Sequence, residues 1–307
     1  MKSTLAPIVF FGFNRPQHTR QVLESLSRNP LAAESVLYIF IDGPKPGATE
    51  AALNAIAEVK KVIREKQWCK EVHIEESESN KGLIKANVEG VTKIINQYGK
   101  MIAIEDDNLL SPGFLQFMND ALNFYEDNPK VMHIAAFRRP DLNHVDVKES
   151  TYFFYHTTTW GWATWKRAWD NYSLDAMAVR EKVKKKGHIN KLNMDNTFEF
   201  YWGLKAVALG KLRSWNAIWH STVFLNDGLC LYPQKSLVAN IGHDGSGTNC
   251  EPDERFDIAN NELATAIPVT AIPLQNHEGI RKAYIKLHSL QYRFMFIVKH
   301  YLRYIFR

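Results

Sequence analysis

The sequence predicts an α/β protein with a mostly parallel, Rossmann-like central sheet and helices on both faces. Within the first 130 residues, short apolar stretches rich in β-branched and aromatic residues alternate with stretches that repeat apolar residues at helical spacing. The strand-like stretches are nearly continuously apolar, which is typical of strands buried on both faces. At 307 residues and 45% apolar content, the chain is long enough to bury a large core.

Four strands are predicted in this half, at residues 7–13, 36–41, 72–77 and 101–104. The first helix begins at Arg15-Pro16, because proline suits the first helical position. The turn Asp42-Gly43-Pro44 ends the second strand, and a helix with Leu53 and Ile56 on one face follows. The next helix repeats apolar residues from Ile84 to Ile95 at steps of four, three and four. Ser111-Pro112 is expected to cap and open the fourth helix.

Polar residues follow the carboxyl ends of these strands. In open α/β sheets, ligands bind in the crevice beyond those ends. The sequence therefore predicts one polar site made from several segments. Its members are Asn14, Arg15, Asp42, Asn80, Lys81, Glu105, Asp106 and Asp107.

Neither G-x-G-x-x-G nor G-x-x-x-x-G-K-[ST] occurs, so the phosphate-binding loops of dinucleotide and P-loop proteins are absent from the sequence. A bound phosphate would depend on Arg15, Lys81 and a divalent cation. Mn²⁺ or Mg²⁺ takes oxygen ligands from one or two carboxylates and completes its shell with water and substrate phosphates. The three adjacent acids at residues 105–107 suit that role. The alternative is that they are solvated turn residues.

The ordered segments "FFGFNRP", "IDGP", "SNKG", "IAIEDDNLLSPGFLQF" and "HIAAF" resemble nucleotide-sugar-dependent glycosyltransferases of the type A (GT-A) fold. The resemblance covers Pro7 to about Cys250. "EDDNLLSPGFL" is similar to the corresponding segment of N-acetylglucosaminyltransferases I. "TTTWGWATWKRAW" and "LYPQKSLVANIGHDGSGTNC" resemble bacterial glycosyltransferases of surface-polysaccharide clusters.

The resemblance implies roles in a donor site. Asn14 and Arg15 would line the nucleotide, Asp42 would accept a hydrogen bond from the base, and Asn80 and Lys81 would lie near the nucleotide or diphosphate. Asp107 would bind the metal directly, Glu105 and Asp106 would close the site through ribose or metal-bound water, and His243 would complete the metal shell. The alternatives are a turn-capping Asp42, a solvated Lys81 and a turn histidine at 243.

The second half is expected to hold the acceptor and the chemistry. Trp160 and Trp162 flank Gly161 and are expected to wall the donor sugar or acceptor, whereas Trp165 and Trp169 are expected in the core. The resemblance places the general base on a helix predicted at residues 196–209.

Asp195 and Glu199 are the candidates for that base, one helical turn apart, and the alternative is that they are acids favoured by the helix dipole. Arg213 occupies a position where the relatives often carry an acid, which departs from their pattern. His220 is predicted on a helix surface.

From Ile280 the chain reads as a basic amphipathic helix, with an apolar stripe and no acid to the end. Such a helix can lie in a membrane interface, and the alternative is docking on the domain or on a second copy in a homodimer. We therefore predict a GT-A domain at residues 1–255, with a nucleotide-binding half (1–110) and an acceptor half (111–255), and a C-terminal extension at 256–307.

Bulk properties narrow the class of protein. The formal charge of +5 gives no reason to expect nucleic-acid binding. Cys69, Cys230 and Cys250 lack C-x-x-C spacing, which favours a reducing compartment. No apolar stretch reaches the roughly 20 residues of a spanning helix, and the N-terminus reads as a strand rather than a signal peptide. A cytoplasmic protein is expected, with peripheral contact at the inner face of the membrane.

The resulting expectation is a metal-dependent glycosyltransferase. It would move a sugar, with inversion, from a UDP-linked donor such as UDP-GlcNAc to a glycan or lipid-linked acceptor in cell-surface polysaccharide synthesis. One alternative is a catalytically degenerate nucleotide-binding or scaffold protein at the membrane surface. Another is a nucleotidyltransferase, although the glycine-rich phosphate loop expected of that class is poorly matched by "FGFNRPQ".

Overall fold

The computed structural model describes residues 5–245, 262–287 and 298. Eight strands form one sheet in the order β3-β2-β1-β4-β8-β6-β9-β7, and six of them run in the same direction. The predicted mostly parallel sheet is therefore confirmed. The strands are β1 (Ile8–Gly12), β2 (Val36–Ile41), β3 (Glu71–Glu76), β4 (Lys100–Glu105), β6 (Val131–Ala135), β7 (Thr151–Phe154), β8 (Trp162–Trp165) and β9 (Leu229–Pro233).

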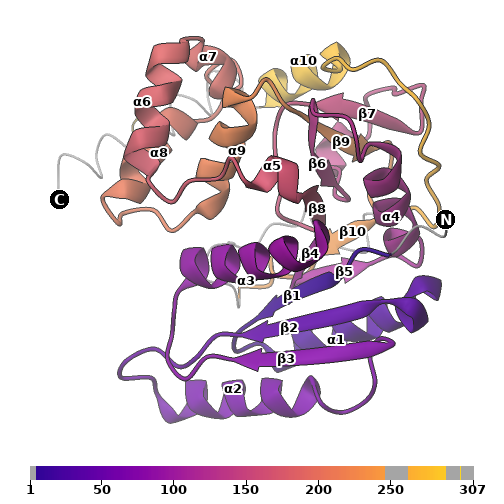
Figure 1. The fold of residues 1–307 in the computed structure, drawn as a ribbon, viewed down its shortest axis with the longest axis vertical. Helices are drawn as coiled ribbons and strands as arrows, with labels where there is room; N and C mark the ends of the chain where they lie inside the picture. Colours follow the sequence, from indigo (N-terminus) through magenta and orange to yellow (C-terminus); the bar gives the residue numbers. More distant parts are fainter. Residues whose placement is uncertain (1–4, 246–261, 288–297, 299–307) are drawn as a thin grey trace.

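Helices cover both faces of this sheet (Figure 1). Side chains alternate between the two faces along each strand, so Ile8 and Phe10 of β1 join one core while Val9 and Phe11 join the other. The first core includes α1 (Pro16–Ser27), α2 (Glu50–Val62) and α4 (Phe114–Phe124). The second includes α3 (Leu83–Tyr98), α5 (Lys166–Trp169), α9 (Trp215–Leu225) and α10 (Glu278–Leu287).

A helical unit extends from this body. It contains α6 (Ala176–Lys186), α7 (Ile189–Leu192), α8 (Phe200–Ala208) and one side of α9, and these helices share a third apolar cluster. A separate antiparallel ribbon pairs β5 (Asn108–Leu110) with β10 (Val238–Asn240). The ribbon matters for the site because it brings residues far apart in the chain next to the end of β4.

The four predicted strands and the core positions of Trp165 and Trp169 are confirmed. The predicted cap of the fourth helix is wrong, because α4 begins at Phe114 and Gly113 is its N-cap. A Cβ atom at Gly113 would lie 2.1 Å from the carbonyl oxygen of Thr265. The close approach of this distant segment sets the start of the helix, and a single-sequence pattern does not contain it.

The helix predicted at residues 196–209 begins later than expected. Met194, Asp195 and Asn196 all have positive φ angles, of 50°, 56° and 64°, which no helix accommodates. The Asn193 side chain accepts a hydrogen bond from the Tyr201 N–H, and α8 starts at Phe200. Asp195 and Glu199 therefore do not lie one helical turn apart on a common helix face.

The C-terminal helix docks on the domain over its described length. Ile280 and Tyr284 of α10 are buried in the second core, and the His277 N–H donates to the Phe153 carbonyl at 2.9 Å. Arg281 forms ion pairs with Asp195 and Glu278. The docked alternative is thus correct for α10, and the prediction that this part of the apolar stripe faces a bilayer is wrong. The stripe beyond residue 287 lies outside the described residues.

Among the described residues, the structure contains no helix whose length and apolar content would allow it to cross a bilayer. Cys69 and Cys230 are buried free thiols, and Cys250 lies outside the described part of the chain.

His220 is buried in α9, so its predicted place on a helix surface is wrong. Its ring nitrogen Nε2 lies 3.0 Å from the Leu192 carbonyl oxygen, which can only accept, so Nε2 donates. Burial lowers the pKa of His220 to about 4, and burial likewise lowers the pKa of His133 to about 3. Both imidazoles are therefore neutral in the folded protein at pH 7.

We predict that these two buried histidines lower the free energy of unfolding of the protein in acid. The unfolded chain takes up a proton at each histidine near pH 6.5, while the folded chain resists protonation until about pH 4, so the stabilising effect is present above pH 6.5 and is lost as the pH falls. His220→Gln keeps a donor toward Leu192 without titrating. Between pH 7 and 4.5, its free energy of unfolding should fall by about 2 kcal/mol less than that of the wild type. Urea titrations at both pH values measure the difference, and an equal loss in both proteins would contradict the assignment.

Candidate functional site

The carboxyl ends of the first four strands lie at one level of the sheet. In the parallel register, Gly12 of β1 pairs with Ile41 of β2, and Ile41 pairs with Glu76 of β3. On its other side, β1 pairs Phe11 with Glu105 of β4. The residues that follow these strands therefore share one edge of the sheet, as the sequence predicted.

Arg15 and two of the three adjacent acids form a buried ionic cluster. The Arg15 guanidinium contacts the Asp106 carboxylate, and its Nη2 lies 3.0 Å from Asp107 Oδ2. Arg15 is the N-cap residue of α1 and thus directly follows the end of β1, whereas the acids follow β4. Asn14 precedes Arg15 in the same connection. The neighbouring positions of β1 and β4 in the sheet explain why these charges meet.

The cluster contains more acid than Arg15 balances. Burial, followed by the charges of Asp107 and Asp106, raises the pKa of Glu105 to about 8. Burial also raises the pKa of Asp106, although Arg15 opposes this effect. Burial lowers the pKa of Arg15, but the charges of Asp106 and Asp107 outweigh it and raise that pKa above its ordinary value. The site is therefore electrostatically suited to an additional cation.

Asn108 orders the cluster, and the sequence analysis did not single it out. Its side-chain Nδ2 donates to Asp107 Oδ1 at 2.8 Å, and its Oδ1 accepts from the backbone N–H groups of Glu105 and Gly161. One buried amide thus fixes both the Asp107 carboxylate and the start of the tryptophan segment. Its place directly after "EDD" was the available signal.

The β5–β10 ribbon brings the late loop over the same acids. The Ile241 N–H donates to the Asp107 carbonyl at 2.8 Å, and a Cβ atom at Gly242 would lie 2.6 Å from Asp107 Oδ2. His18 of α1 contacts this loop, with Nε2 3.1 Å from the Ile241 carbonyl oxygen and 3.3 Å from Asp244 Oδ2. The loop is therefore held against both β4 and α1.

His243 follows in that loop, and its ring centroid lies 5.5 Å from that of Trp160. The structure thus brings His243 to the neighbourhood of the acids and of one predicted sugar-contacting tryptophan. Its role as a metal ligand stays a prediction.

Asp42 anchors the loop that contains Asn80 and Lys81. Its Oδ1 accepts from the backbone N–H groups of Gly43 and Lys81, and its Oδ2 accepts from Asn80 Nδ2 and the Gly82 N–H, at 2.8–3.0 Å. The Lys81 ammonium pairs with Glu89 at 2.8 Å. The predicted contacts of Asp42 with a base and of Lys81 with a phosphate stay predictions. In this structure, both side chains contact their own chain.

We predict that Asp42→Asn loosens this loop. Each carboxylate oxygen accepts two hydrogen bonds, and an amide nitrogen would face two N–H donors at one of these positions. The free energy of unfolding should fall by about 2 kcal/mol. Urea denaturation measures this change, with Asp127→Asn, at an exposed aspartate, as the control that should change little. Equal stability of both variants would show that the four hydrogen bonds do not hold the loop.

A cavity of about 230 Å³ opens beside the cluster. Trp160 lines it and, through His243 and the Asn108–Gly161 hydrogen bond, connects it to the acids. Among the described residues, the lining contains aromatic rings, hydroxyl groups, one amide and the Arg139 guanidinium, but no Asp or Glu. The lining residues are Phe137, Arg139, Leu142, Tyr152, Phe154, His156, Thr157, Thr158, Thr159, Trp160, Asn216, Tyr232, Ile280 and Tyr284.

Several of these side chains are held by their own contacts. Tyr152 and Tyr232 stack with centroids 5.4 Å apart, and the Tyr232 hydroxyl donates to the His156 carbonyl at 2.8 Å. Thr157 Oγ1 donates to Asn216 Oδ1 at 2.8 Å. Flat aromatic faces beside hydroxyl and amide groups suit a ligand that has both apolar and hydroxyl-bearing surfaces, such as a sugar.

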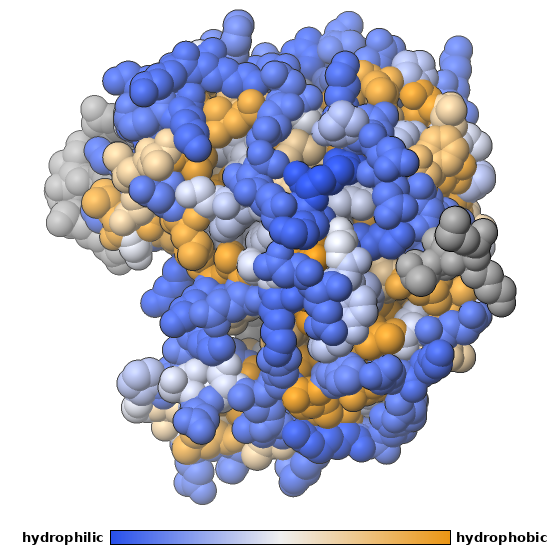
Figure 2. All heavy atoms as spheres, viewed as in Figure 1, coloured by the Kyte–Doolittle hydropathy of each residue, from blue (hydrophilic) through white to orange (hydrophobic). Residues whose placement is uncertain are grey.

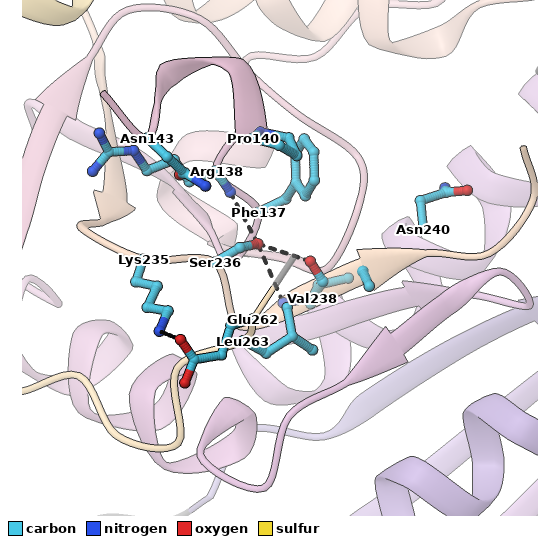
Figure 3. A pocket seen from close by; sticks show the side chains of 11 residues that line it. Phe137, Arg138, Pro140, Asn143, Lys235, Ser236, Val238, Asn240, Glu262 and Leu263 are labelled. Carbon is cyan, nitrogen blue, oxygen red and sulfur yellow. Dashed lines mark hydrogen bonds and ion pairs between the residues drawn. The ribbon is translucent and has the colours of Figure 1, made fainter. Parts of the chain in front are cut away.

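A second, smaller cavity of about 20 Å³ lies beside Phe137 and Asn240 (Figure 3). Its polar groups mostly bind one another. The Ser236 hydroxyl accepts from the Arg138 N–H and contacts the Val238 carbonyl at 2.7 Å, and Lys235 pairs with Glu262 at 2.6 Å. This space fits about one water molecule and serves as a junction between segments.

Trp162, the other tryptophan expected to contact sugar, lies in the core. It stacks on His133 at 5.4 Å and packs against Trp215 at 5.1 Å. Of the pair that flanks Gly161, only Trp160 lines the larger cavity. The alternation of side chains along β8 turns Trp162 inward.

The acids fit a cation that takes most of its ligands from a substrate. No group of three or more His, Cys, Asp or Glu in the described residues is arranged to hold a metal ion. Asp106 and Asp107 offer two buried carboxylates, and Mg²⁺ or Mn²⁺ beside a diphosphate needs only one or two. Within the described residues, the donor set is thus compatible with a metal site that a substrate completes.

No protein-family model matches the chain, and no curated protein sequence matches it. Among solved structures, it is similar to S. aureus TarS, with 13% identity over 78% of this chain and 37% of that one, and a TM-score of 0.42. It is also similar to mouse xyloside xylosyltransferase 1 (12% identity, 71% and 81% covered, TM-score 0.36). A third similar structure is UDP-glucose pyrophosphorylase complexed with UDP-glucose. It is 11% identical over 75% of this chain and 90% of that one, with a TM-score of 0.38. The chain spans less than two thirds of the TarS chains it matches.

Proposed function

We propose that this protein is a glycosyltransferase that moves a sugar from a nucleotide diphosphate donor, UDP-linked in the first instance, to a glycan or lipid-linked acceptor of cell-surface polysaccharide. The observation that carries the proposal is the juxtaposition of two sites. The Arg15–Asp106–Asp107 cluster suits a metal diphosphate, and the neighbouring cavity suits a sugar.

Each part of the cluster has a role in donor binding. Arg15 would bind a phosphate oxygen, and Asp106 and Asp107 would hold Mn²⁺ or Mg²⁺, which would supply positive charge beside the diphosphate. Asn108 keeps the Asp107 carboxylate in position, and the loop at Gly242 and His243 covers the same side of the site.

Transfer requires a base near the acceptor hydroxyl. That oxygen forms a bond to the anomeric carbon while the bond to the diphosphate breaks, and the proton passes to the base. Asp195 contacts Arg281, so we assign the base to Glu199. Glu199 is not among the residues that line the cavity, but its neighbours Phe198 and Phe200 have rings 5.7 Å from the ring of His156 in the cavity wall. Attack from the face opposite the diphosphate gives inversion.

Product analysis tests the proposal. The full-length protein is incubated with Mn²⁺ and a panel of UDP-, GDP- and dTDP-sugars, and the nucleotides are separated by ion-exchange chromatography. With water as the acceptor in this mixture, slow hydrolysis of one donor to its sugar and nucleoside diphosphate, lost in Asp107→Ala, is the expected result. Release of pyrophosphate from a nucleoside triphosphate and a sugar phosphate would instead identify a nucleotidyltransferase. If no donor released a nucleotide and the protein bound none of the nucleotides, the scaffold alternative would be favoured.

A further inference from the structure

Three large apolar side chains lie exposed at one end of the helical unit. Trp202 in α8, Leu209 at its C-terminal end and Leu212 in the following turn are 52%, 58% and 40% exposed. Trp202 and Leu209 are seven residues apart, so they share one face of the helix. A Cβ atom at Gly203 would lie 3.7 Å from Leu212 Cδ2, which puts Leu212 beside the same helix. We call these three residues the α8 patch.

The α8 patch stands on an ordered support. The opposite face of α8 is buried, with Tyr201 and Leu204 in the apolar cluster shared with α6 and α9. The Arg180 guanidinium lies 4.1 Å from the Tyr201 ring centroid and 5.4 Å from that of Trp202. Trp202 thus lies against Arg180 while about half of its surface stays exposed. Figure 2 shows apolar surface interspersed with hydrophilic surface over the flank where Figure 1 has α6 and α8.

Positive charge surrounds the α8 patch. Lys205 lies between Trp202 and Leu209 on α8, Lys211 and Arg213 flank Leu212, and residues 200–213 contain no acid. Residues 176–213 carry nine Lys or Arg against three Asp or Glu, a formal +6, while the entire chain carries +5. This helical unit is thus one of two strongly basic segments of the chain, the other being residues 280–307, which carry seven Lys or Arg and no acid.

This combination identifies the class of partner. Interfaces between proteins are depleted in lysine, whereas surfaces that bind anionic bilayers combine Trp and Leu with surrounding Lys and Arg. Tryptophan resides at the headgroup level, leucine reaches the acyl boundary, and each basic side chain gains from nearby lipid phosphates. Exposed apolar residues elsewhere, such as Leu53 and Phe124, lack this setting. Phe124 is followed by Glu126 and Asp127.

We propose that the α8 patch and its basic surround bind an anionic lipid surface. The inference does not depend on the catalytic proposal. It also differs from contact through α10, whose apolar residues Ile280 and Tyr284 are buried against the domain.

Vesicle flotation of the full-length protein tests this assignment. The wild type should float with phosphatidylcholine vesicles that contain 30% phosphatidylserine, bind pure phosphatidylcholine at least tenfold more weakly, and lose binding in 0.5 M NaCl. The triple variant Trp202→Ser/Leu209→Ser/Leu212→Ser should bind the anionic vesicles about tenfold more weakly than the wild type. Phe124→Ser is the matched control, since Phe124 is 49% exposed, and should bind as the wild type does. All the substituted side chains are exposed, and equal melting temperatures verify the folds.

Fluorescence locates the contact. Of the eight tryptophans, Trp202 is the exposed one, Trp160 is partly buried and the other six are buried. Brominated lipid should quench the wild type, whereas Trp202→Phe should still float but lose that quenching.

Three results would overturn the proposal. The wild type fails to bind anionic vesicles, the triple variant binds them like the wild type, or Trp202→Phe is quenched as strongly as the wild type. A further outcome is a wild-type dimer in sedimentation equilibrium that the triple variant abolishes without any lipid binding. It would reassign the patch to contact between copies.

Discussion

Arg15→Leu is expected to lower the free energy of unfolding at pH 7 by about 3 kcal/mol, because it leaves the buried Asp106 and Asp107 carboxylates without their guanidinium partner. The same change should abolish nucleotide diphosphate binding. The deficit should shrink as the pH falls from 7 to 5. Burial raises the pKa of Asp106 and Arg15 opposes this rise, so without Arg15 the folded variant takes up a proton at Asp106 and is relatively stabilised as acidity increases.

Urea denaturation of both proteins at pH 7 and pH 5 measures these effects. Arg20→Leu is the matched control, because the Arg20–Glu65 pair is exposed and its loss should change the free energy of unfolding little. If Arg15→Leu were as stable as the wild type at pH 7, the claim that Arg15 stabilises the buried acids would be refuted.

Tyr284→Ala is expected to release α10 from the domain. The ring is buried, lies 5.5 Å from that of Phe154 and 5.8 Å from that of His156, and forms part of the cavity wall. Truncation of a large buried aromatic costs about 3 kcal/mol. Amide hydrogen exchange should therefore show lost protection in α10, and the cavity should lose one side.

Lys282→Ala is the control on the same helix, since Lys282 is exposed and should leave protection unchanged. If Tyr284→Ala and Lys282→Ala exchange alike, the docking of α10 does not depend on this ring, and the cavity wall needs another explanation.

The sequence predicted those parts of the site that depend on parallel strand order. Once β1, β2 and β4 were recognised as buried strands, their carboxyl ends had to lie at one edge, so Arg15 was expected near Asp106 and Asp107. The hydrogen-bonding groups of Asp42 and Asn80 were likewise expected near each other. These conclusions follow from local patterns together with one general property of α/β sheets.

The rest of the site depends on contacts between distant segments. Positive φ angles at residues 194–196 delay the start of α8, and Trp162 turns inward because β8 inserts between β4 and β6. The cavity joins residues from β7, β9, α9 and α10, which no local period links. The sequence pattern predicted membrane contact through the C-terminal helix. Because Ile280 and Tyr284 of that helix are buried, we propose α8 as the contact surface instead.

The central claim is that the acids at the end of β4 hold a metal nucleotide diphosphate. The most direct test is the melting temperature of wild type and Asp107→Ala with UDP, GDP, CDP or dTDP, each with and without Mn²⁺. We predict that one nucleotide raises the melting temperature of the wild type only when Mn²⁺ is present, and that Asp107→Ala abolishes this rise. A rise of equal size in the variant, or no rise with any nucleotide, would contradict the claim.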